Sequence, residues 1–488
     1  MILPRSAPCD EGVDATGLVA FLDAVERRGI ELHSLMVARH GRVVAEGWWT
    51  PYAADRAHLV YSVSKSLTST AVGFLVHEGA LTLDDLVLPR LGEVPAERLH
   101  PGWSRVTLRH CLTMTVGHDT DAWEPAFAGA EADVFRPGTD WLPLVLATAP
   151  EHEPGTTFTY NQVATYLVSR LVHAVTGQGL VEILRRRLLE PLGITELAWQ
   201  RDPLGHELGF TGAHLTTEAL LAFTQFCLHG GAWGERQLLP REWFAEASRP
   251  FGPPNRDPAG NADSVLGYGY SFWTSRHGFR ADGAFGQLGL VLPEQDAVVA
   301  ITAEHAPMQE ILDEFWPTAF PALGRAGSAA ADALLAERLA DLALPPPSRA
   351  ARSGVLPGPE AASFVRAEGH GDRSLPGAYS GVTVRRDRAG HLLGLQRNGL
   401  PLELAVGQGD WLESVLEVES RRLPVVARGG WQDGDRFQAD VLVIESPHRF
   451  RVEGRRSSGE VTLTWRACPL TGPDPLDLAV RTMPQHAR

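Results

Sequence analysis

The stretch from Tyr61 to Thr70 constrains this chain more than any other. It contains Lys65, which is the only lysine among 488 residues in a chain that otherwise uses arginine as its basic residue. From Ser64 to His77 the apolar residues recur with a helical period, which predicts a buried helix. Ser62 then lies at the start of this helix and Lys65 one turn further on, where side chains at i and i+3 are neighbours.

The pairing of a serine with a lysine at this spacing indicates proton chemistry. Arginine keeps its proton at all ordinary pH values, whereas the pKa of a lysine can be tuned until the amine acts as a base. The positive end of the helix favours an alkoxide at Ser62 and lowers the pKa of a nearby ammonium. Because the spacing alone also arises by chance, the interpretation depends on further features.

Composition excludes several classes of function. The net charge is −15 and the arginines are spread along the chain, which argues against a nucleic-acid or anionic membrane surface. The four cysteines form no Cys-x-x-Cys pair and fit a reducing compartment. No signal peptide and no membrane span is recognisable, so we expect a cytoplasmic protein. No metal-ligand spacing or phosphate loop is present, so we expect neither a metal nor a cofactor.

The order of predicted elements indicates an α+β catalytic domain over residues 1–325. A helix (16–28) and a β-hairpin (32–38 and 43–49) precede the Ser62 stretch, and a helical subdomain follows over about residues 80–250. Three strands, 267–274, 286–291 and 297–303, come next, and the last two are joined by Pro293 to Asp296. Strands on both sides of a helical segment predict one antiparallel sheet with helices beside it.

The remaining chain predicts a linker and a small β domain. A helix (329–342) and a stretch rich in Pro, Gly and Ala make residues 326–375 a connection. Alternating segments then predict an antiparallel β-barrel over 376–488. Its eight candidate strands are 379–385, 391–397, 402–406, 411–418, 424–428, 436–445, 449–454 and 461–466.

Several motifs make the chain similar to a known family. The Ser-x-x-Lys tetrad opening a helix resembles that of the penicillin-recognising serine enzymes, which include class C β-lactamases, DD-peptidases and related esterases. Further matching segments run from His33 to Gly41, Val106 to Met114, Glu190 to Ile194 and Gly267 to Trp273. The resemblance covers roughly residues 10 to 320. The C-terminal domain is similar to the lipocalin-like domain that some members of the family carry.

The resemblance implies a three-part catalytic site. It makes Ser62 the nucleophile that becomes acylated and Lys65 the group that helps to remove its proton. The family's second element, a tyrosine before a helix, matches Tyr160, which would pass a proton to the leaving group. Gln162 stands where the family usually has asparagine, and we expect it to offer its amide to a substrate carbonyl.

The family's third element is altered in this chain. Ala281 and Asp282 stand where a basic residue and a threonine usually hold a substrate carboxylate. Gly283 still permits close approach of a substrate, and the N–H groups of Ala284 and Ser62 would form the oxyanion hole. The sequence supports two interpretations of Asp282: it faces a substrate amine, or it is an ordinary residue at a strand end.

We therefore expect a serine hydrolase or acyltransferase that acts on an ester or amide bond of a small-molecule or peptide substrate. One alternative is a transacylase of a natural-product pathway that transfers the acyl group to an amine or alcohol. A second is a weakly catalytic homologue that binds β-lactams or peptides, or a D-amino-acid peptidase. The missing carboxylate anchor favours the esterase, amidase and transfer interpretations over an efficient β-lactamase. The oligomeric state does not follow from the sequence.

Overall fold

The computed structural model describes residues 2–92, 99–128, 132–255, 261–345, 359–367, 371, 373–418 and 421–479. The chain forms two compact units. The first consists of Met1–Gly47 and Leu59–Asp341, and the second of Trp48–His58 and Leu342–Arg488. Each unit has its own sheet and its own buried apolar residues.

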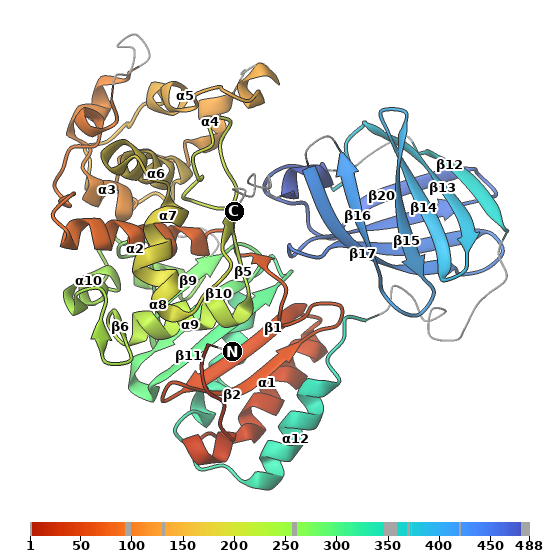
Figure 1. Ribbon diagram of the computed structural model, residues 1–488, viewed down its shortest axis with the longest axis horizontal. Helices are drawn as coiled ribbons and strands as arrows, with labels where there is room; N and C mark the ends of the chain where they lie inside the picture. Colours follow the sequence, from red (N-terminus) through yellow and green to blue (C-terminus); the bar gives the residue numbers. More distant parts are fainter. Residues whose placement is uncertain are drawn as a thin grey trace. The chain divides into compact units, whose positions relative to one another are not determined.

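The first unit is built on a six-stranded sheet with the order β2-β1-β11-β10-β9-β8 (Figure 1). Its pairs from β1 through to β8 are antiparallel. Strands from both ends of the unit thus share one sheet, which confirms the expected α+β class. The strands are β1 (Leu32–Arg39), β2 (Arg42–Trp48), β8 (Trp273–Ser275), β9 (Gly278–Gly283), β10 (Gln287–Leu292) and β11 (Ala297–Ala303).

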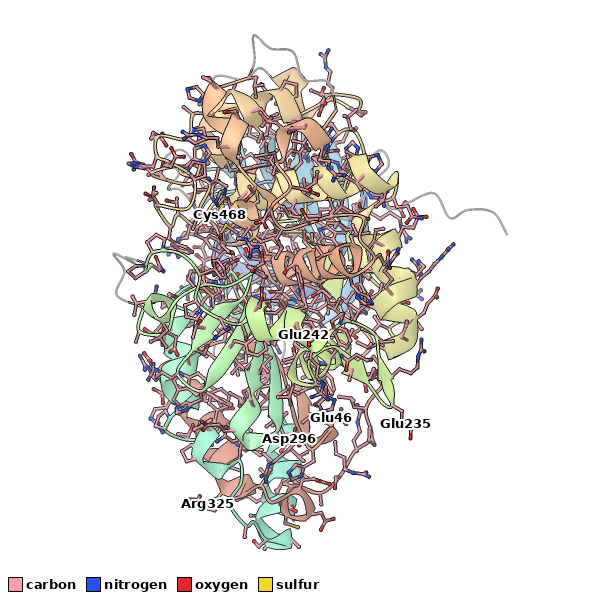
Figure 2. The ribbon with its side chains drawn as sticks, turned by 90° about the vertical axis from the view of Figure 1, so that its left-hand side faces the viewer. Glu46, Glu235, Glu242, Asp296, Arg325 and Cys468 are labelled. Carbon is pink, nitrogen blue, oxygen red and sulfur yellow. The ribbon has the colours of Figure 1, made fainter. Side chains whose placement is uncertain are left out.

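The centre of this sheet follows the sequence prediction, whereas its edge does not. Strands β10 and β11 are buried along their whole length. The turn between them leaves Asp296, labelled in Figure 2, at φ 46°. The predicted strand 267–274 is wrong for most of its length, because Gly267 at φ 124° and Ser271 at φ 61° interrupt the extended backbone. The edge of the sheet is instead formed by the hairpin of β8 and β9.

Helices cover the sheet and form a subdomain at one side of it, drawn in orange to yellow in Figure 1. Helix α9 packs against β1, β10 and β11, while α1 packs against α11 and α12. The helices are α1 (Ala15–Arg28), α2 (Val63–His77), α3 (Leu108–Leu112), α4 (Trp123–Phe127), α5 (Leu142–Ala147), α6 (Gln162–Thr176), α7 (Leu180–Leu184), α8 (Glu190–Leu192), α9 (Thr217–Leu228), α10 (Arg241–Ala247), α11 (Gln309–Phe315) and α12 (Ala329–Ala340). The short strands β3 (His58–Leu59), β4 (Ala198–Trp199), β5 (Ala213–Leu215), β6 (Ala232–Trp233) and β7 (Arg236–Gln237) complete this part of the chain.

Helix α2 lies between the sheet and the helical subdomain. It contacts β9 and β10 on the sheet side and α6 and α7 on the other. All residues from Val63 to Leu75 are therefore buried, including the polar ones. The helix ends at His77 and is capped by Glu78, after which Gly79 turns the chain at φ 76°. A polar side chain at the start of this helix is consequently held by packing from both layers.

The second unit contains a β-barrel with one strand more than predicted. The strand order is β15-β14-β13-β12-β20-β19-β18-β17-β16, and an additional pairing of β15 with β17 closes the barrel. Pairing is antiparallel except between β12 and β20 and between β15 and β17. The strands are β12 (Ala361–Arg366), β13 (Tyr379–Asp387), β14 (Gly390–Arg397), β15 (Leu400–Gly407), β16 (Leu412–Val418), β17 (Arg421–Trp431), β18 (Arg436–Val443), β19 (Arg449–Arg455) and β20 (Glu460–Trp465).

Strand β12 corrects the predicted linker, because it lies inside the stretch assigned to the connection. Only Phe364 of this strand is buried, and Val365 is exposed, so its sequence lacks the alternation of the other strands. The second unit also includes the segment Trp48–His58. There the Tyr52 hydroxyl donates to the Ser446 carbonyl at 3.1 Å.

All four cysteines are free thiols: Cys111 and Cys227 are buried, and Cys9 and Cys468 are partly exposed (Cys468 is labelled in Figure 2). Across the described residues, none of the helices combines the length and apolar character needed to cross a membrane.

Candidate active site

Lys65 is held in one position by three oxygen atoms. Its side chain is buried, and its Nζ lies 2.9 Å from Ser62 Oγ, 2.6 Å from Gln162 Oε1 and 2.9 Å from the Phe210 carbonyl oxygen. Two of these acceptors, Gln162 Oε1 and Phe210 O, have no proton to give. In a neutral amine the two N–H bonds therefore point to them, and the nitrogen lone pair is left to face Ser62 Oγ.

Burial makes this neutral state accessible. Burial lowers the pKa of Lys65 to about 7, against the opposing influence of the negative charges of Asp121 and Asp282. The shift is in the direction expected for an ammonium removed from water. At neutral pH a substantial fraction of the Lys65 side chains thus carries a free lone pair at hydrogen-bonding distance from a hydroxyl.

Tyr160 contacts both Ser62 and Lys65. Its phenol hydrogen-bonds Ser62, and Lys65 Nζ lies 4.7 Å from the centroid of its ring. The ring stacks on Trp273 at 5.5 Å, which fixes its orientation. Burial raises the pKa of Tyr160 well above its usual value, so this phenol stays protonated and is suited to hand a proton on rather than to remove one.

The start of helix α6 brings Tyr160 and Gln162 to the site. Asn161 caps this helix, because its side chain accepts a hydrogen bond from the Val163 N–H. Residues 160 and 162 therefore flank the cap: Tyr160 reaches Ser62 and Lys65, and Gln162 reaches Lys65. The amide oxygen of Gln162 accepts a hydrogen bond from Lys65, so only the NH2 group of this amide could face a substrate carbonyl, as expected from the sequence.

Asp121 is a site residue that the sequence did not indicate. Its carboxylate accepts hydrogen bonds from the backbone N–H groups of Gln162 at 3.0 Å and Trp123 at 3.1 Å, and from the Gln162 side chain. The Gln162 amide thus donates to Asp121 and accepts from Lys65, so Asp121 determines which end of the amide faces the lysine. Burial raises the pKa of Asp121, and the hydrogen bonds and the charge of Lys65 oppose that rise. No spacing motif connects Asp121 with Lys65, so only the tertiary structure reveals this contact.

The backbone N–H groups of Ser62 and Ala284 are the two donors that the sequence predicts for the oxyanion hole. Among the described residues, neither the Ser62 nor the Ala284 N–H donates a hydrogen bond within the chain. Strand β9 comes very close to the Ser62 segment at Gly283, where an added Cβ would lie 2.2 Å from the Val60 carbonyl oxygen. The glycine is therefore required for this approach.

The backbone on both sides of these donors is strained. Tyr61 precedes Ser62 at φ 46° and Phe285 follows Ala284 at φ 65°, a region that bulky residues rarely adopt. The two rings pack together with their centroids 5.4 Å apart. Strain of this kind persists only where the surrounding packing compensates for it, and it concentrates at functional sites.

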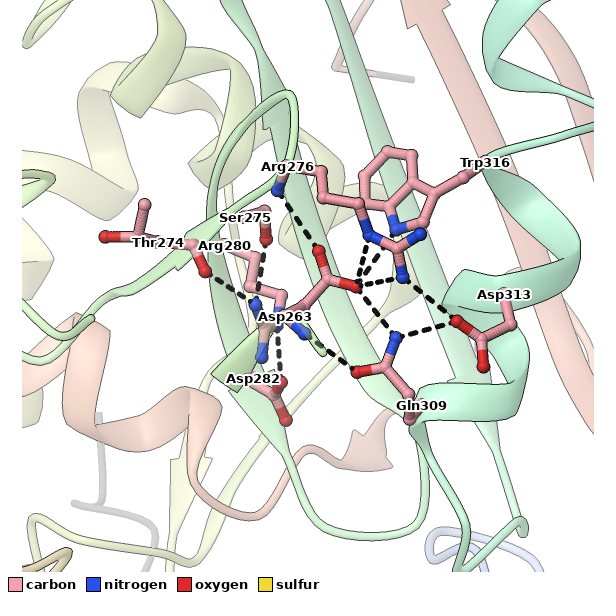
Figure 3. Close-up of polar contacts among 9 residues, drawn as sticks. All are labelled: Asp263, Thr274, Ser275, Arg276, Arg280, Asp282, Gln309, Asp313 and Trp316. Atoms are coloured by element: carbon pink, nitrogen blue, oxygen red, sulfur yellow. Dashed lines mark hydrogen bonds and ion pairs between the residues drawn. The ribbon is translucent and has the colours of Figure 1, made fainter. Parts of the chain in front are cut away.

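Asp282 is engaged by a residue of its own strand. Arg280 Nε donates to its carboxylate at 2.6 Å; the Arg280 side chain is buried and that of Asp282 is 9% exposed. The Arg280 guanidinium also donates to the Thr274 carbonyl and the Ser275 hydroxyl, as Figure 3 shows. Burial raises the pKa of Asp282, although the nearby Arg280 opposes the rise. Asp282 of the altered third element is thus held in an internal ion pair.

A second buried carboxylate supports the same hairpin. Asp263 accepts hydrogen bonds from Arg276, Gln309 and Trp316 (Figure 3). Burial would raise its pKa, but these hydrogen bonds outweigh burial and lower it. Arg276 follows β8 directly, so this network connects the edge of the sheet to α11 and fixes the strand that carries Gly283.

The structure brings most of the predicted site residues together. Ser62, Lys65, Tyr160 and Gln162 are linked by direct hydrogen bonds, and Gly283 contacts the segment before Ser62. Within the described parts of the chain, no group of three or more histidine, cysteine or acidic side chains is arranged to hold a metal ion.

Comparison with known proteins identifies the family. The sequence profile of the Beta-lactamase family matches residues 20–314. This match covers more than half of the chain, so the chain belongs to the Beta-lactamase family.

Individual relatives are distant. Lovastatin esterase from Penicillium rubens is 27% identical over 170 residues, which cover 32% of this chain and 42% of that protein. The 6-aminohexanoate-dimer hydrolase from Paenarthrobacter ureafaciens is 26% identical over 248 residues, 49% of this chain and 63% of that protein. The chain thus spans about half the length of these curated relatives. Among solved structures, a putative 6-aminohexanoate-dimer hydrolase from Bacillus anthracis shares the fold with a TM-score of 0.51 and 19% identity, over 66% of this chain and 87% of that one.

Proposed function

We propose that this protein is a serine hydrolase of ester or amide bonds that forms an acyl-enzyme on Ser62. The observation that carries the proposal is the position of Lys65, whose Nζ lies 2.9 Å from Ser62 Oγ and has its other two hydrogen-bonding directions occupied by pure acceptors. A buried lysine with a pKa near neutrality is a suitable general base. The names of the two curated relatives, an esterase and a dimer hydrolase, support the same class.

The proposed reaction begins with proton transfer from Ser62 Oγ to the neutral Lys65 amine. Ser62 then attacks the substrate carbonyl carbon, and the N–H groups of Ser62 and Ala284 stabilise the negative oxygen. The proton passes through the Tyr160 phenol to the leaving alcohol or amine as its bond to the acyl carbon breaks. Water takes the place of the leaving group and gives its proton to the same relay, which releases the acid and restores Ser62.

The third element favours substrates without a carboxylate next to the scissile bond. The nearby guanidinium of Arg280 is already paired with Asp282 at 2.6 Å, so it does not offer a free positive charge. We therefore propose simple esters and amides as the substrate class, rather than β-lactams or peptides with a terminal carboxylate. A fluorescent penicillin should accordingly label the protein more slowly than an uncharged active-site probe.

The test combines covalent labelling with turnover. The wild-type protein is incubated with a fluorophosphonate probe and its intact mass recorded, while turnover is followed with p-nitrophenyl acetate. We expect one label, located on Ser62, and multiple turnovers. Ser62→Ala should lose the label, and both Ser62→Ala and Lys65→Arg should lose at least about a thousandfold in kcat, because alanine is no nucleophile and arginine is no base.

Circular dichroism and a thermal melt confirm that each variant is folded. A folded Lys65→Arg variant that keeps wild-type turnover contradicts the proposed base. Labelling of Ser62 without turnover contradicts the hydrolase and favours a binding protein. Product mass spectrometry with an added amine or alcohol measures how the acyl group divides between water and the acceptor.

A further inference from the structure

A connected group of aromatic side chains lies in the helical subdomain, next to the proposed site. We define the aromatic wall as Trp123, Phe127, Phe135 and Trp141. Trp123 contacts Phe127 at 4.9 Å and Trp141 at 5.7 Å between ring centroids. Phe135 stacks on Phe127 at 6.4 Å and meets Trp141 edge-on at 5.9 Å. Helix α4 supplies two of these rings, and the segment leading into α5 supplies Trp141.

The aromatic wall is continuous with the reacting groups through Phe210. The ring of Phe210 lies 4.4 Å from that of Trp123, centroid to centroid. The carbonyl oxygen of Phe210 accepts a hydrogen bond from Lys65, and Lys65 Nζ lies 5.7 Å from the Phe210 ring. A path of aromatic rings thus leads from Lys65 outwards to Phe135. The carboxylate of Asp121 anchors its beginning, because it accepts from the Trp123 backbone N–H at 3.1 Å.

Part of this aromatic surface is open rather than packed as core. Phe135 is 60% exposed, and Trp123 and Phe127 are only partly buried. Single exposed apolar residues are common, but a connected set beside a catalytic centre is characteristic of a ligand-binding surface.

A second aromatic group also reaches Lys65, through the ring of Tyr160, and has a different character. Tyr160, Tyr268 and Trp273 pack on one another, with Tyr268 and Trp273 at 4.7 Å. The Arg280 guanidinium covers Trp273 at 5.8 Å, and Tyr268 is buried. This group contains the proton donor for the leaving group, so a leaving group belongs on its side. The acyl portion of a substrate then extends towards Phe210.

We propose that the aromatic wall is the acyl-binding surface of the site and that the preferred substrates carry an extended apolar or aromatic acyl group. This inference rests on the proposed function and specifies its substrate class. Burial of acyl methylenes against the rings raises kcat/KM by about fourfold for each methylene. The wall then selects long acyl chains over acetyl, and Trp123, the ring nearest to Phe210, contributes most.

The test compares two esters that differ only in the acyl chain, p-nitrophenyl acetate and p-nitrophenyl hexanoate. For the wild-type protein we expect a ratio of kcat/KM, hexanoate over acetate, of at least about thirtyfold. Trp123→Ala should lower this ratio by about tenfold or more. Phe135→Ala, at a side chain that is 60% exposed and thus safe for folding, should lower the ratio less but in the same direction.

The matched control is Trp233→Ala, which removes a partly buried tryptophan from β6, a strand of the same unit that contributes nothing to the wall. It should leave the ratio and both rates unchanged. An unaltered hexanoate-to-acetate ratio in both folded wall variants overturns the proposed acyl surface while the hydrolase stands. No Ser62-dependent turnover of either ester by the wild-type protein overturns the proposed function itself.

Discussion

The rate of ester hydrolysis should follow the neutral fraction of Lys65 as the pH changes. The side chain is buried and its pKa is lowered to about 7. Only the neutral amine accepts the proton of Ser62, so activity is lost as the pH falls through this pKa and is gained as it rises. The acid limb of the profile of kcat/KM against pH should therefore have its midpoint near neutrality.

The size of the effect separates this prediction from an ordinary lysine. With a pKa of about 7, the neutral fraction is about 9% at pH 6 and about 91% at pH 8, so kcat/KM rises about tenfold and then levels off. A lysine with its usual pKa would give a rise of about a hundredfold over the same range, and no plateau before pH 9. The plateau is the diagnostic feature.

The assay measures initial rates with p-nitrophenyl acetate from pH 5.5 to 9, with Ser62→Ala as the control for background hydrolysis at each pH. Saturation near pH 8 agrees with the proposed base. A rate that keeps rising tenfold per pH unit up to pH 9 refutes the reasoning, because the burial of Lys65 would then not have produced a neutral amine.

Three further predictions concern the surroundings of the same site. Asp121→Asn removes a negative charge that raises the pKa of Lys65, so the acid limb of the pH profile should move to lower pH. A midpoint that stays in place or rises contradicts the assignment of this limb to Lys65. Gly283→Ala places a Cβ 2.2 Å from the Val60 carbonyl oxygen. The resulting shift of the backbone should displace the oxyanion donors and lower kcat by about a hundredfold. Gly377→Ala, where an added Cβ meets nothing within 4 Å, should leave kcat unchanged in the same assay. Asp282→Ala leaves the buried guanidinium of Arg280 without its carboxylate and should cost about 3–5 kcal/mol in the free energy of unfolding, measured by denaturant titration. Replacement of both Arg280 and Asp282 by leucine should restore most of that stability, and equal losses in the single and double variants would contradict the ion-pair argument.

The elements nearest the nucleophile were the most predictable from sequence. Helix α2 begins within one residue of its predicted start, because its helical period runs unbroken from Ser64 and a glycine, Gly79, follows its end. Strand β12 escaped prediction because its residues bury only one ring, Phe364, and its conformation depends on pairing with β13 and β20. Local pattern carries no information about such partners.

The residues of the candidate site also differ in whether the sequence could predict them. Ser62, Lys65 and Tyr160 were accessible because each stands in a short motif. Asp121 and Phe210 were not, because their contacts with Gln162 and Lys65 join segments about forty and about 145 residues apart in sequence. The Phe210 carbonyl could not be predicted from a pattern of side chains, since the backbone of any residue type could supply this acceptor.

The electrostatics of the site connect its altered third element to its substrate. Arg280 and Asp282 neutralise each other inside the protein, and Asp121 is committed to Gln162 and to the backbone of α4. On the proposed mechanism Lys65 must also be neutral when it acts. Neither of the two basic side chains described at this site, Lys65 and Arg280, then offers a free positive charge to a substrate carboxylate. Binding energy must then come from apolar contact, and the partly open aromatic wall, which Phe210 connects to Lys65, is the surface that offers it. A carboxylate at the end of the acyl chain should therefore weaken hydrolysis relative to the uncharged ester of equal length, and a preference for the charged ester would contradict this account of the site.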